Sequence, residues 1–448
     1  MRFPLLIRAA ALAAVGAALL IPLALVSGKI AERRQLAAGV EQSFARETSG
    51  PQAVVGPLLA LACEETVNEE RVVKRAGREE TITEQKVRPC PTAYVPPRTL
   101  DVAGTVPVES LHRGIYPIRL YRASLAFAGR FDWPGPPSQE GALQRRWKDA
   151  AIVVATGDAR GIKAVSPLQW GTGSVAFAAG RGGGFSLEAP LGEHAAAGPG
   201  PFDYRFTIEV IGTTQLLVGP VGDTSTIRLV SDWPHPSFTG AFSPDRRQVG
   251  PQGFEATWKT THFATGGQAA WQPRVENGKV AKWTHATGFS LADPVNVYSL
   301  SYRATEYGFL FVLFTFAGLA LAEVTAGIRL HPVQYALTGS ALAVFFLLLI
   351  ALAEHIAFGV AYAASASACA ALLAFYLRHP LGNGKRTGAM LALLAVLYGA
   401  LYALLRSEDH ALLAGSILVF GMLATGMVAT RRVRWEDFGA RAPARAAT

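Results

Sequence analysis

Long apolar runs lie at both ends of the chain. The first covers residues 9–26, with Arg2 and Arg8 before it, and reads AALAAVGAALLIPLALVS. At about 18 residues it is just long enough to cross a bilayer as a helix, and it is long for the core of a signal peptide. We therefore expect an uncleaved membrane anchor, continued by the clearest helical pattern outside the apolar runs, residues 30–48.

From Tyr307 onward polar residues become sparse, and five more membrane spans are expected. Their ranges are 307–328, 333–353, 356–377, 387–405 and 411–430. Lipid offers no hydrogen-bond partners, so each run must cross as a helix whose backbone bonds are internal. Small residues are frequent, as in AYAASASACAA, and they allow the close helix packing of a compact five-helix transmembrane bundle.

Between these regions, residues 30–304 alternate apolar and polar positions in short runs. Half-buried strands are indicated by RFTIEVI, TIRLVSDW and SLAFAGRF, which Gly and Pro clusters separate. The pattern predicts a large β-rich domain of antiparallel sheets, arranged as one or more sandwich-like units. The segment near 178–201 is expected to be a flexible loop.

The expected fold class is a membrane protein with an N-terminal transmembrane helix, a β-rich domain outside the cytoplasm and a C-terminal five-helix bundle. The expected divisions are an anchor at 1–29, a β-rich domain at 30–304, a bundle at 305–431 and a cytoplasmic tail at 432–448.

Composition agrees with a chain that is part membrane and part water-exposed. Half of the 448 residues are hydrophobic and 17% are charged. The net charge is +9, and in a membrane protein excess Lys and Arg mark cytoplasmic loops. The sequence has no zinc-finger spacing, Gly-rich phosphate loop or aromatic RNA-binding motif, so nucleic-acid binding is not indicated.

Charge in the loops between the spans indicates their orientation. The second and fourth connections of the C-terminal region carry the acidic stretches EH and RSEDH. The other connections and the end of the last span are basic, with Arg329, Arg378, Lys385, Arg386, Arg431, Arg432 and Arg434. By the positive-inside rule the basic loops face the cytoplasm. Six spans then place both termini in the cytoplasm and the large domain outside it.

The chain has three cysteines. Cys369 lies in an apolar run and is interpreted as packing, whereas Cys63 and Cys90 bracket the charged segment 64–89. In an oxidising compartment these two cysteines could form a disulfide, and closing that loop would stabilise the fold by roughly 3.5 kcal/mol on the chain-entropy model. Two free thiols remain the alternative. The charged segment itself is expected to be a solvated hairpin or protruding loop.

Several long stretches, in this order, resemble the CreD family of bacterial inner-membrane proteins, also called the cell-envelope integrity family. They are HRGIYPIRLYRASLAFAGRF (112–131), SDWPHPSFTGAFSPD (231–245), ATEYGFLFVLFTF (304–316), RLHPVQYALTG (329–339), ALAEHIAFGVAY (351–362) and LRSEDHALLAGS (405–416). The resemblance covers nearly the whole chain. It implies an inner-membrane protein with one large periplasmic domain, linked to a two-component regulatory response, envelope integrity, colicin tolerance and the β-lactam response.

The resemblance assigns no biochemical activity to particular residues. This chain also departs from the family in its Ala- and Gly-rich composition and in its Cys63 and Cys90 pair, which we do not take to be a family feature.

Two outward-facing turns carry acids beside histidines. If their helical hairpins pack together, the carboxylates and imidazoles would form a site for a divalent metal or for proton transfer. This candidate cluster consists of Glu354, His355, Ser407, Glu408, Asp409 and His410.

The structural alternative for these turns is simpler. Charged residues end a span at the membrane interface, Ser407 or Asp409 could cap the following helix, and Arg406 could pair with a neighbouring acid. The cluster lacks the His-Glu-x-x-His motif of zinc proteases, and the chain has no Gly-x-Ser-x-Gly elbow.

Two further features are candidates for function. Glu323 lies within a span, where an acid is costly and usually functional, although near the edge it could instead pair with Arg329. The Pro-framed turn SDWPHPSF places Trp233, His235 and Phe238 together, either to bind a glycan or protein or to pack the end of a sheet.

The leading hypothesis is a non-enzymatic protein of envelope homeostasis, whose β-rich domain contacts an envelope protein or glycan. The first alternative is a membrane enzyme or metal site at the candidate cluster, and the second is a transporter, which the small bundle and apolar span centres disfavour. Apart from a divalent metal at that cluster, we expect no cofactor. The lipid bilayer is the expected partner, and the sequence does not define the oligomeric state.

Overall fold

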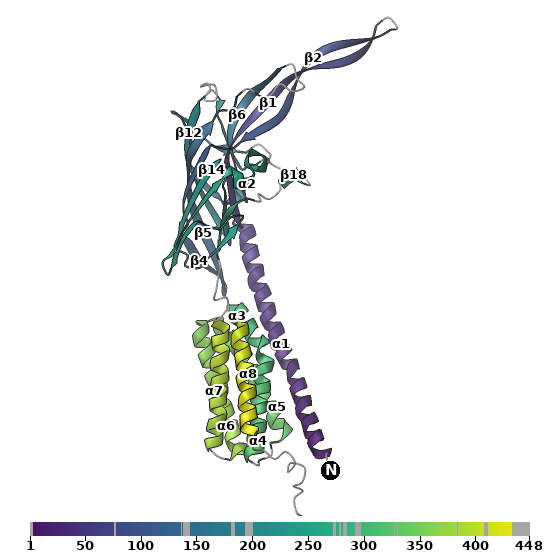
Figure 1. Cartoon of the computed structure of the whole chain (residues 1–448), viewed down its shortest axis with the longest axis vertical. Helices are drawn as coiled ribbons and strands as arrows, with labels where there is room; N and C mark the ends of the chain where they lie inside the picture. Colours follow the sequence, from purple (N-terminus) through teal and green to yellow (C-terminus); the bar gives the residue numbers. More distant parts are fainter. Residues whose placement is uncertain are drawn as a thin grey trace, which may run out of the picture. The chain divides into compact units, whose positions relative to one another are not determined.

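The structure is a computed structural model of the chain, and it divides into two compact units. One comprises Met1–Gly39 with Val295–Thr448, here called the helical unit, and the other is Val40–Pro294, here called the β domain. Figure 1 shows the helices of the first and the sheets of the second. The residues that the structure describes are 3–75, 78–135, 137, 144–180, 184–192, 200–271, 275–276, 279–280, 285–291, 297–326, 328, 330–382, 384–406 and 411–431.

In the residues that the structure describes, the helical unit contains one long N-terminal helix and six later helices. They are α1 (Phe3–Glu47), α3 (Val297–Glu306), α4 (Gly308–Ala326), α5 (Pro332–Ala353), α6 (Phe358–Leu381), α7 (Gly384–Arg406) and α8 (Ala411–Thr430). In the described part of the chain, four helices are long and apolar enough to cross a membrane alone, namely α1, α5, α6 and α7. The pair α3 and α4, bent by 44°, would supply a fifth span.

These helices confirm the membrane-protein fold class. Helices α4 to α8 correspond to the five predicted spans, and α1 continues beyond the first apolar run to Glu47, as the pattern at 30–48 predicted. The described apolar part of α8, Gly415–Val428, is shorter than the others.

Local sequence explains where α5 begins and α6 ends. The Nδ1 atom of His331 accepts a hydrogen bond from the backbone N–H of Val333 at 3.3 Å, while the Oε1 atom of Gln334 accepts one from the backbone N–H of His331 at 2.9 Å. This reciprocal cap, with Pro332 at the first helical position, satisfies amide groups that have no partner inside the helix. Gly382, with φ of 62°, ends α6 in the left-handed conformation.

The helical unit packs through aromatic and small residues. The ring of Phe345 lies 4.8 Å from that of Tyr398 and 5.6 Å from that of Tyr362. Helix α1 packs against α5 where Gly339 leaves room, because a Cβ atom there would lie 2.1 Å from Leu19. Close approach at glycine is the usual device for packing membrane helices.

Among its described residues, the β domain contains two large sheets, one small hairpin and three short helical turns. The strands are β1 (Gln52–Arg75), β2 (Arg78–Val95), β3 (Thr99–Thr105), β4 (Val108–Arg113), β5 (Tyr116–Asp132), β6 (Gln144–Thr156), β7 (Ile162–Val165), β8 (Leu168–Trp170), β9 (Gly173–Val175), β10 (Ala178–Ala179), β11 (Leu187–Pro190), β12 (Pro201–Thr213), β13 (Gln215–Gly219), β14 (Thr224–Ser231), β15 (Pro236–Gly240), β16 (Arg246–Gly250), β17 (Gly253–Thr261), β18 (Val275–Glu276), β19 (Lys279–Val280) and β20 (Thr287–Leu291). The helical turns are η1 (Ala159–Gly161), α2 (His262–Thr265) and η3 (Gly267–Trp271).

Both large sheets contribute to one hydrophobic core. The order of the first is β10-β11-β6-β1-β13-β20-β15, with β2 on β1. The order of the second is β16-β17-β14-β3-β5-β12-β8-β9, with β4 on β5 and β7 on β12. Along β12 the alternation of Phe206 and Ile208 with polar neighbours points the apolar side chains into the core, where Phe206 stacks on Phe127 at 4.9 Å.

The predicted β-rich character is confirmed, with two corrections. The sheets are not wholly antiparallel, because β1 pairs with β13 and β3 with β14 in parallel. The expected loop near 178–201 is wrong where β10 and β11 form, since β11 pairs with β6 and extends the first sheet. Residues 181–183 and 193–199 lie outside the described residues.

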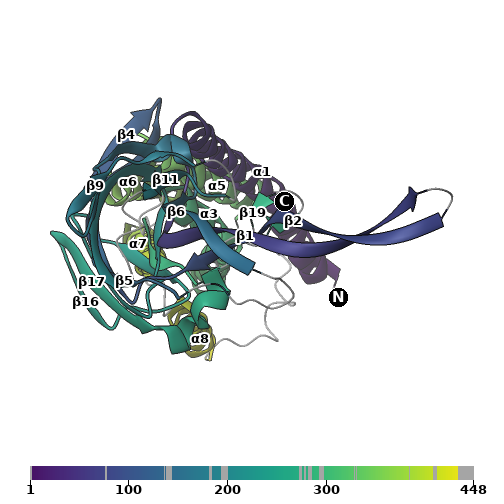
Figure 2. The same ribbon diagram turned by 90° about the horizontal axis from the view of Figure 1, so that it is seen from above.

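The charged segment 64–89 forms most of a long hairpin. Strands β1 and β2 pair from Leu59↔Val95 to Arg75↔Arg78, whereas β6 accompanies β1 only as far as Thr66↔Gln144. Beyond Thr66 the hairpin is a two-stranded ribbon that projects from the sheet, as Figure 2 shows.

A disulfide and a carboxylate fix the base of this ribbon. Cys63 and Cys90 are joined, with their Cα atoms 5.1 Å apart. The carboxylate of Glu65, whose side chain is 6% exposed, accepts hydrogen bonds from Arg88 at 2.7 Å and Arg145 at 2.8 Å. These hydrogen bonds, first that of Arg88, lower the pKa of Glu65. A charge buried at a strand boundary is thereby fully compensated.

The unit boundaries lie about ten residues from the expected divisions at 29/30 and 304/305. Helix α1 continues past its apolar run, and the amphipathic helix α3 precedes the bent junction with α4. Residues 432–448 lie outside the described residues.

Replacing Cys63 and Cys90 by Ser removes a cross-link between residues 27 apart in sequence. We expect the free energy of unfolding of the β domain to fall by roughly 3.5 kcal/mol, because the open loop gains conformational entropy in the unfolded chain. Tryptophan fluorescence during chemical denaturation measures this, since every tryptophan except Trp435 lies in the β domain. Reduced wild-type protein should show the same loss, and an unchanged transition in the Ser variant would contradict the prediction.

Candidate functional site

Glu354 and His355, the first part of the candidate cluster, lie directly after α5. The backbone amide of Glu354 donates to the carbonyl of Ile350 and ends the helix. Its carboxylate, 10% exposed, forms an ion pair with Arg33 of α1, with Nε and Oε1 separated by 3.7 Å. His355 is exposed in the turn between α5 and α6. The structure thus pairs Glu354 with the N-terminal helix, a partner that the sequence patterns did not identify.

The second part of the cluster, Ser407, Glu408, Asp409 and His410, lies outside the described residues. Convergence of the two turns therefore stays a prediction. Glu354 and His355 alone offer two donors, fewer than the three or four protein ligands of a zinc site. Across the described ranges, no group of three or more His, Cys, Asp or Glu side chains is placed to hold a metal ion.

Glu323 serves the turn that joins α4 to α5. Its carboxylate accepts hydrogen bonds from the backbone amide of Leu330 and from the hydroxyl of Tyr335, the latter at 3.2 Å. Because Tyr335 and Leu330 are buried, the carboxylate provides hydrogen bonds to a hydroxyl and an amide that are shielded from water. Arg329, the partner considered from the sequence, lies outside the described residues.

The Pro-framed turn divides its aromatic residues between the core and the surface. Phe238 packs edge-on against Phe254 at 5.6 Å and Trp258 at 5.9 Å. Trp233 is half-buried; its indole N–H donates to the carbonyl of His235 at 2.9 Å, and the guanidinium of Arg119 lies 5.1 Å from its ring. His235 is exposed, so only the outer part of this turn is available to a ligand.

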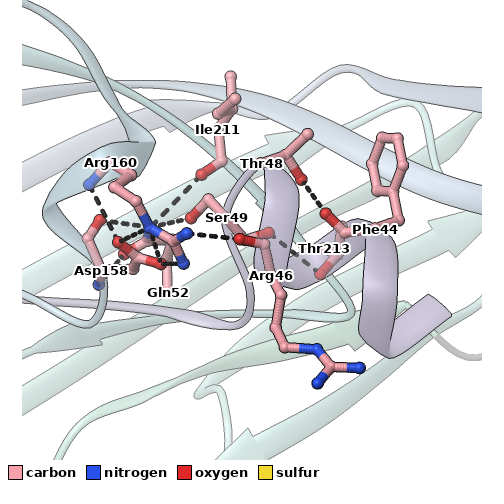
Figure 3. A network of polar contacts seen from close by, with 9 residues as sticks. All are labelled: Phe44, Arg46, Thr48, Ser49, Gln52, Asp158, Arg160, Ile211 and Thr213. Atoms are coloured by element: carbon pink, nitrogen blue, oxygen red, sulfur yellow. Dashed lines mark hydrogen bonds and ion pairs between the residues drawn. The ribbon is translucent and has the colours of Figure 1, made fainter. Parts of the chain in front are cut away.

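A network of polar contacts, part of it buried, lies where α1 ends in the β domain, as Figure 3 shows. We call it the junction network. Its members are Phe44, Arg46, Thr48, Ser49, Gln52, Asp158, Arg160, Ile211 and Thr213.

Gln52 is the centre of the junction network. Its side-chain amide, 1% exposed, donates to the carbonyl of Asp158 at 2.9 Å, to that of Ile211 at 3.5 Å and to the hydroxyl of Ser49. The amide oxygen accepts from the backbone N–H of Asp158 at 3.1 Å. One side chain thus connects β1 with the turn after β6 and with β12, using both its donor and its acceptor.

The last turn of α1 receives partners from the surrounding chain. Thr48 donates to the carbonyl of Phe44 through both its backbone and its hydroxyl, at 2.9 and 2.7 Å. Arg160 donates to the carbonyl of Arg46, and the backbone of Thr213 donates to the carbonyl of Gly50 at 3.2 Å. Carbonyls at a helix C-terminus have no hydrogen-bond partner inside the helix. A cation beside them also interacts favourably with the negative end of the helix dipole.

Arg160 is itself held by an acid. Asp158 contacts the guanidinium at distances from 2.6 to 3.1 Å and also accepts from the backbone N–H of Arg160 at 3.0 Å. The hydrogen bonds from Arg160 lower the pKa of Asp158. Asp158 therefore holds the guanidinium in the position from which it donates to the carbonyl of Arg46.

Glycine is required beside this network. A Cβ atom on Gly161 would lie 2.2 Å from the amide nitrogen of Gln52, 2.6 Å from the carbonyl oxygen of Ile211 and 2.7 Å from the hydroxyl of Ser49. The absence of a side chain at this position lets the turn approach β1 closely enough for the Gln52 hydrogen bonds to form.

The chemistry of the junction network is that of a structural clamp. Its side chains form hydrogen bonds with backbone carbonyls and amides, and the ion pair between Asp158 and Arg160 fixes the position of the guanidinium. Sequence reasoning missed it because Gln52 and Asp158 are 106 residues apart, and neither belongs to a recognisable motif. The only local signal is a helix that ends in Thr48-Ser49-Gly50-Pro51 before a strand.

Changing Gln52 to Ala should lower the free energy of unfolding of the β domain by about 2 kcal/mol, because buried groups lose their hydrogen-bond partners. Gln169→Ala provides a matched control, since Gln169 is exposed on β8. Chemical denaturation followed by tryptophan fluorescence gives both values. Equal transitions for the two variants would show that the network does not stabilise the domain.

The comparisons with known proteins concern nearly the entire chain. Residues 4–436 match the family model described as Inner membrane protein CreD. The protein named Inner membrane protein CreD from Escherichia coli (strain K12) is 33% identical over 433 residues, which are 94% of this chain and 91% of that protein.

One solved structure gives only a weak likeness. A zinc metallopeptidase from Deinococcus radiodurans aligns with 43% of this chain and 41% of its own, at 14% identity and a TM-score of 0.19, which is too low to carry a fold argument. The family match and the E. coli relative, both described as inner membrane proteins, agree with the apolar helices described above. The chain therefore belongs to the CreD family of inner membrane proteins.

Proposed function

We propose that this protein supports the integrity of the bacterial cell envelope without catalysis, through contact of a periplasmic β domain with an envelope protein or glycan. The observation that carries the proposal is the end of α1 in the junction network. A helix that begins in an apolar run leads directly into Ser49 and Gln52, which are buried in a large β domain. Such a construction suits display of a binding domain at a membrane surface better than catalysis within the bilayer.

Two features support a periplasmic β domain. The disulfide between Cys63 and Cys90 requires an oxidising compartment. The basic connection between α6 and α7, with Lys385 and Arg386, favours the cytoplasm for that end of the helices. Arg33 would oppose this orientation by charge alone, but its ion pair with Glu354 compensates it.

The exposed surface of the β domain is rich in ion pairs that hold its own strands together. Arg130 pairs with Asp203 at 2.8 Å, and Arg228 pairs with Glu255 at 2.8 Å. Each pair bridges neighbouring strands of the second sheet, between β5 and β12 and between β14 and β17. These groups are engaged in cross-strand pairs and do not converge on a pocket, which supports binding over catalysis.

The alternative of a metal or proton site at Glu354, His355, Glu408, Asp409 and His410 makes a different prediction about mutants. It requires the histidines to act in the bilayer interface, whereas the proposal assigns function to the β domain. The transporter alternative predicts substrate flux in proteoliposomes.

Orientation can be measured with single cysteines in a Cys369→Ser background. Ala126 is exposed on the second sheet, and Gly384 begins α7 beside the basic connection. We expect a membrane-impermeant maleimide to label Ala126→Cys in intact spheroplasts and to label Gly384→Cys only after lysis, because of the positive-inside arrangement. Labelling in the reverse order would place the β domain in the cytoplasm.

Function can be tested by complementation of a gene deletion. At equal membrane levels, the His355→Ala/His410→Ala variant should restore resistance to detergent and β-lactam as fully as wild type. A chain in which a flexible linker replaces residues 50–291 should fail like an empty vector. Failure of the histidine variant would assign function to the turns, and success of the shortened chain would exclude the β domain as the functional part.

A further inference from the structure

The outer edge of β2 lies open on the projecting ribbon. Among the described residues, β2 pairs with no strand other than β1, and side chains from Thr81 to Arg88 are exposed. The ladder has no register shift between Cys63↔Cys90 and Arg75↔Arg78. The backbone groups of this edge are therefore arranged regularly enough to pair with another strand.

Proteins usually blunt such an edge with proline, a bulge, a short strand or charged side chains; of these devices the stretch Thr81 to Arg88 has only charges, which a strand of complementary charge can still pair with. Here Pro89 and Pro91 interrupt the edge only near the disulfide, and the stretch Thr81 to Arg88 contains neither proline nor glycine. It also exposes Ile82 and Val87, at 45% and 59%. Because a two-stranded ribbon is only marginally stable in water, a third strand would stabilise it.

The charged residues along β2 indicate which strand would pair with this edge. Gln85 is flanked by Glu84 and Lys86. If two copies of β2 lie antiparallel about a two-fold axis at Gln85, each Glu84 faces the Lys86 of the other copy. The same register places Thr83 opposite Val87, a pairing that suits sheets. Parallel pairing in register would instead place like charges side by side.

The ladder within one chain leaves the charge of Glu84 uncompensated. Glu84 stands directly opposite Glu69 on β1, and like charges in that position are destabilising. The ammonium of Lys86 contacts the carboxylate of Glu69 at 2.9 Å. In the described part of the chain no ion pair is formed by Glu84, so the Lys86 of a second copy would supply its counter-charge.

We propose that the β2 edge binds a second copy of this chain, in an antiparallel strand pair centred on Gln85. Main-chain hydrogen bonds supply the attraction, and the Glu84–Lys86 pairs between copies set the direction and register. An edge contact of this kind is small, but copies held in one membrane meet at a high effective concentration. The contact gives a symmetric dimer, since the same surface is used by both copies.

Cross-linking of the full-length protein in native membranes tests the proposal. Gln85→Cys should form an intermolecular disulfide upon mild oxidation, because the two-fold axis places both residues opposite each other. Glu70→Cys is the matched control: Glu70 is exposed on β1 of the same ribbon and lies away from the β2 edge. The dimer yield of this control should be at most about a tenth of that of Gln85→Cys, which corresponds to a free-energy difference of ~1.4 kcal/mol.

Charge exchange separates this contact from folding. In the Gln85→Cys background, Glu84→Lys or Lys86→Glu alone should lower the dimer yield about tenfold, and the two together should restore it. Glu84→Lys does not threaten the hairpin, since the new cation faces Glu69. The native disulfide, followed by gel mobility without reductant, reports that the hairpin is intact.

Several results would overturn the proposal. Absence of a Gln85→Cys dimer while the hairpin is intact excludes the contact. A double exchange that stays as low as the single ones excludes the Glu84–Lys86 register. Equal yields from Glu70→Cys and Gln85→Cys indicate random collision, and a Gln85→Cys adduct containing only a different protein assigns the edge to another partner.

Discussion

The structure depends on how the polar end of α1 is satisfied inside the β domain. A helix leaves its last carbonyls without partners, and burial without compensation costs about 1–3 kcal/mol for each such group. Arg160 donates to the carbonyl of Arg46 in the last turn of α1, while Gln52 and Thr213 satisfy backbone carbonyls beside it, at Asp158 and Gly50. The position of β1 follows from this clamp, and β1 in turn carries the first sheet and the projecting hairpin. Gly161 belongs to the same constraint, because any side chain there would displace the Gln52 amide.

The two units provide partners for their backbone hydrogen-bonding groups in different ways. In the helical unit backbone bonds are internal to each helix, so close packing through glycine and aromatic side chains supplies the contacts between helices. In the β domain backbone bonds run between strands, and a charged side chain that is buried there needs partners. Glu65 illustrates the rule, since two arginines hold it at the base of the hairpin. At the far part of the ribbon the rule is met less completely, and Glu84 faces Glu69.

Charged residues at the helix ends show why position in a span does not establish a function. Glu323 accepts hydrogen bonds across the turn between α4 and α5, and Glu354 pairs with Arg33. Both carboxylates therefore have structural partners, which offset the free-energy cost of placing a charge near a bilayer. The family assignment concerns the whole chain, while the proposed binding role concerns the β domain. Complementation separates that role from the candidate cluster that the sequence suggested.

The sequence by itself determined the approximate limits of the helices in the apolar runs, the strands at 124–131 and 205–211 and the hairpin, because hydropathy and alternation are local properties. It also identified Glu354 as a residue of interest and Cys63 and Cys90 as a possible disulfide. Only the tertiary structure decided that this disulfide forms and which residue pairs with Glu354. Gln52 meets Asp158 across 106 residues, Glu65 meets Arg145 across 80, and Arg33 of α1 meets Glu354 after α5. The parallel pairing of β1 with β13 was likewise invisible. Such contacts depend on which surfaces become buried together, and no local period of the chain encodes that choice.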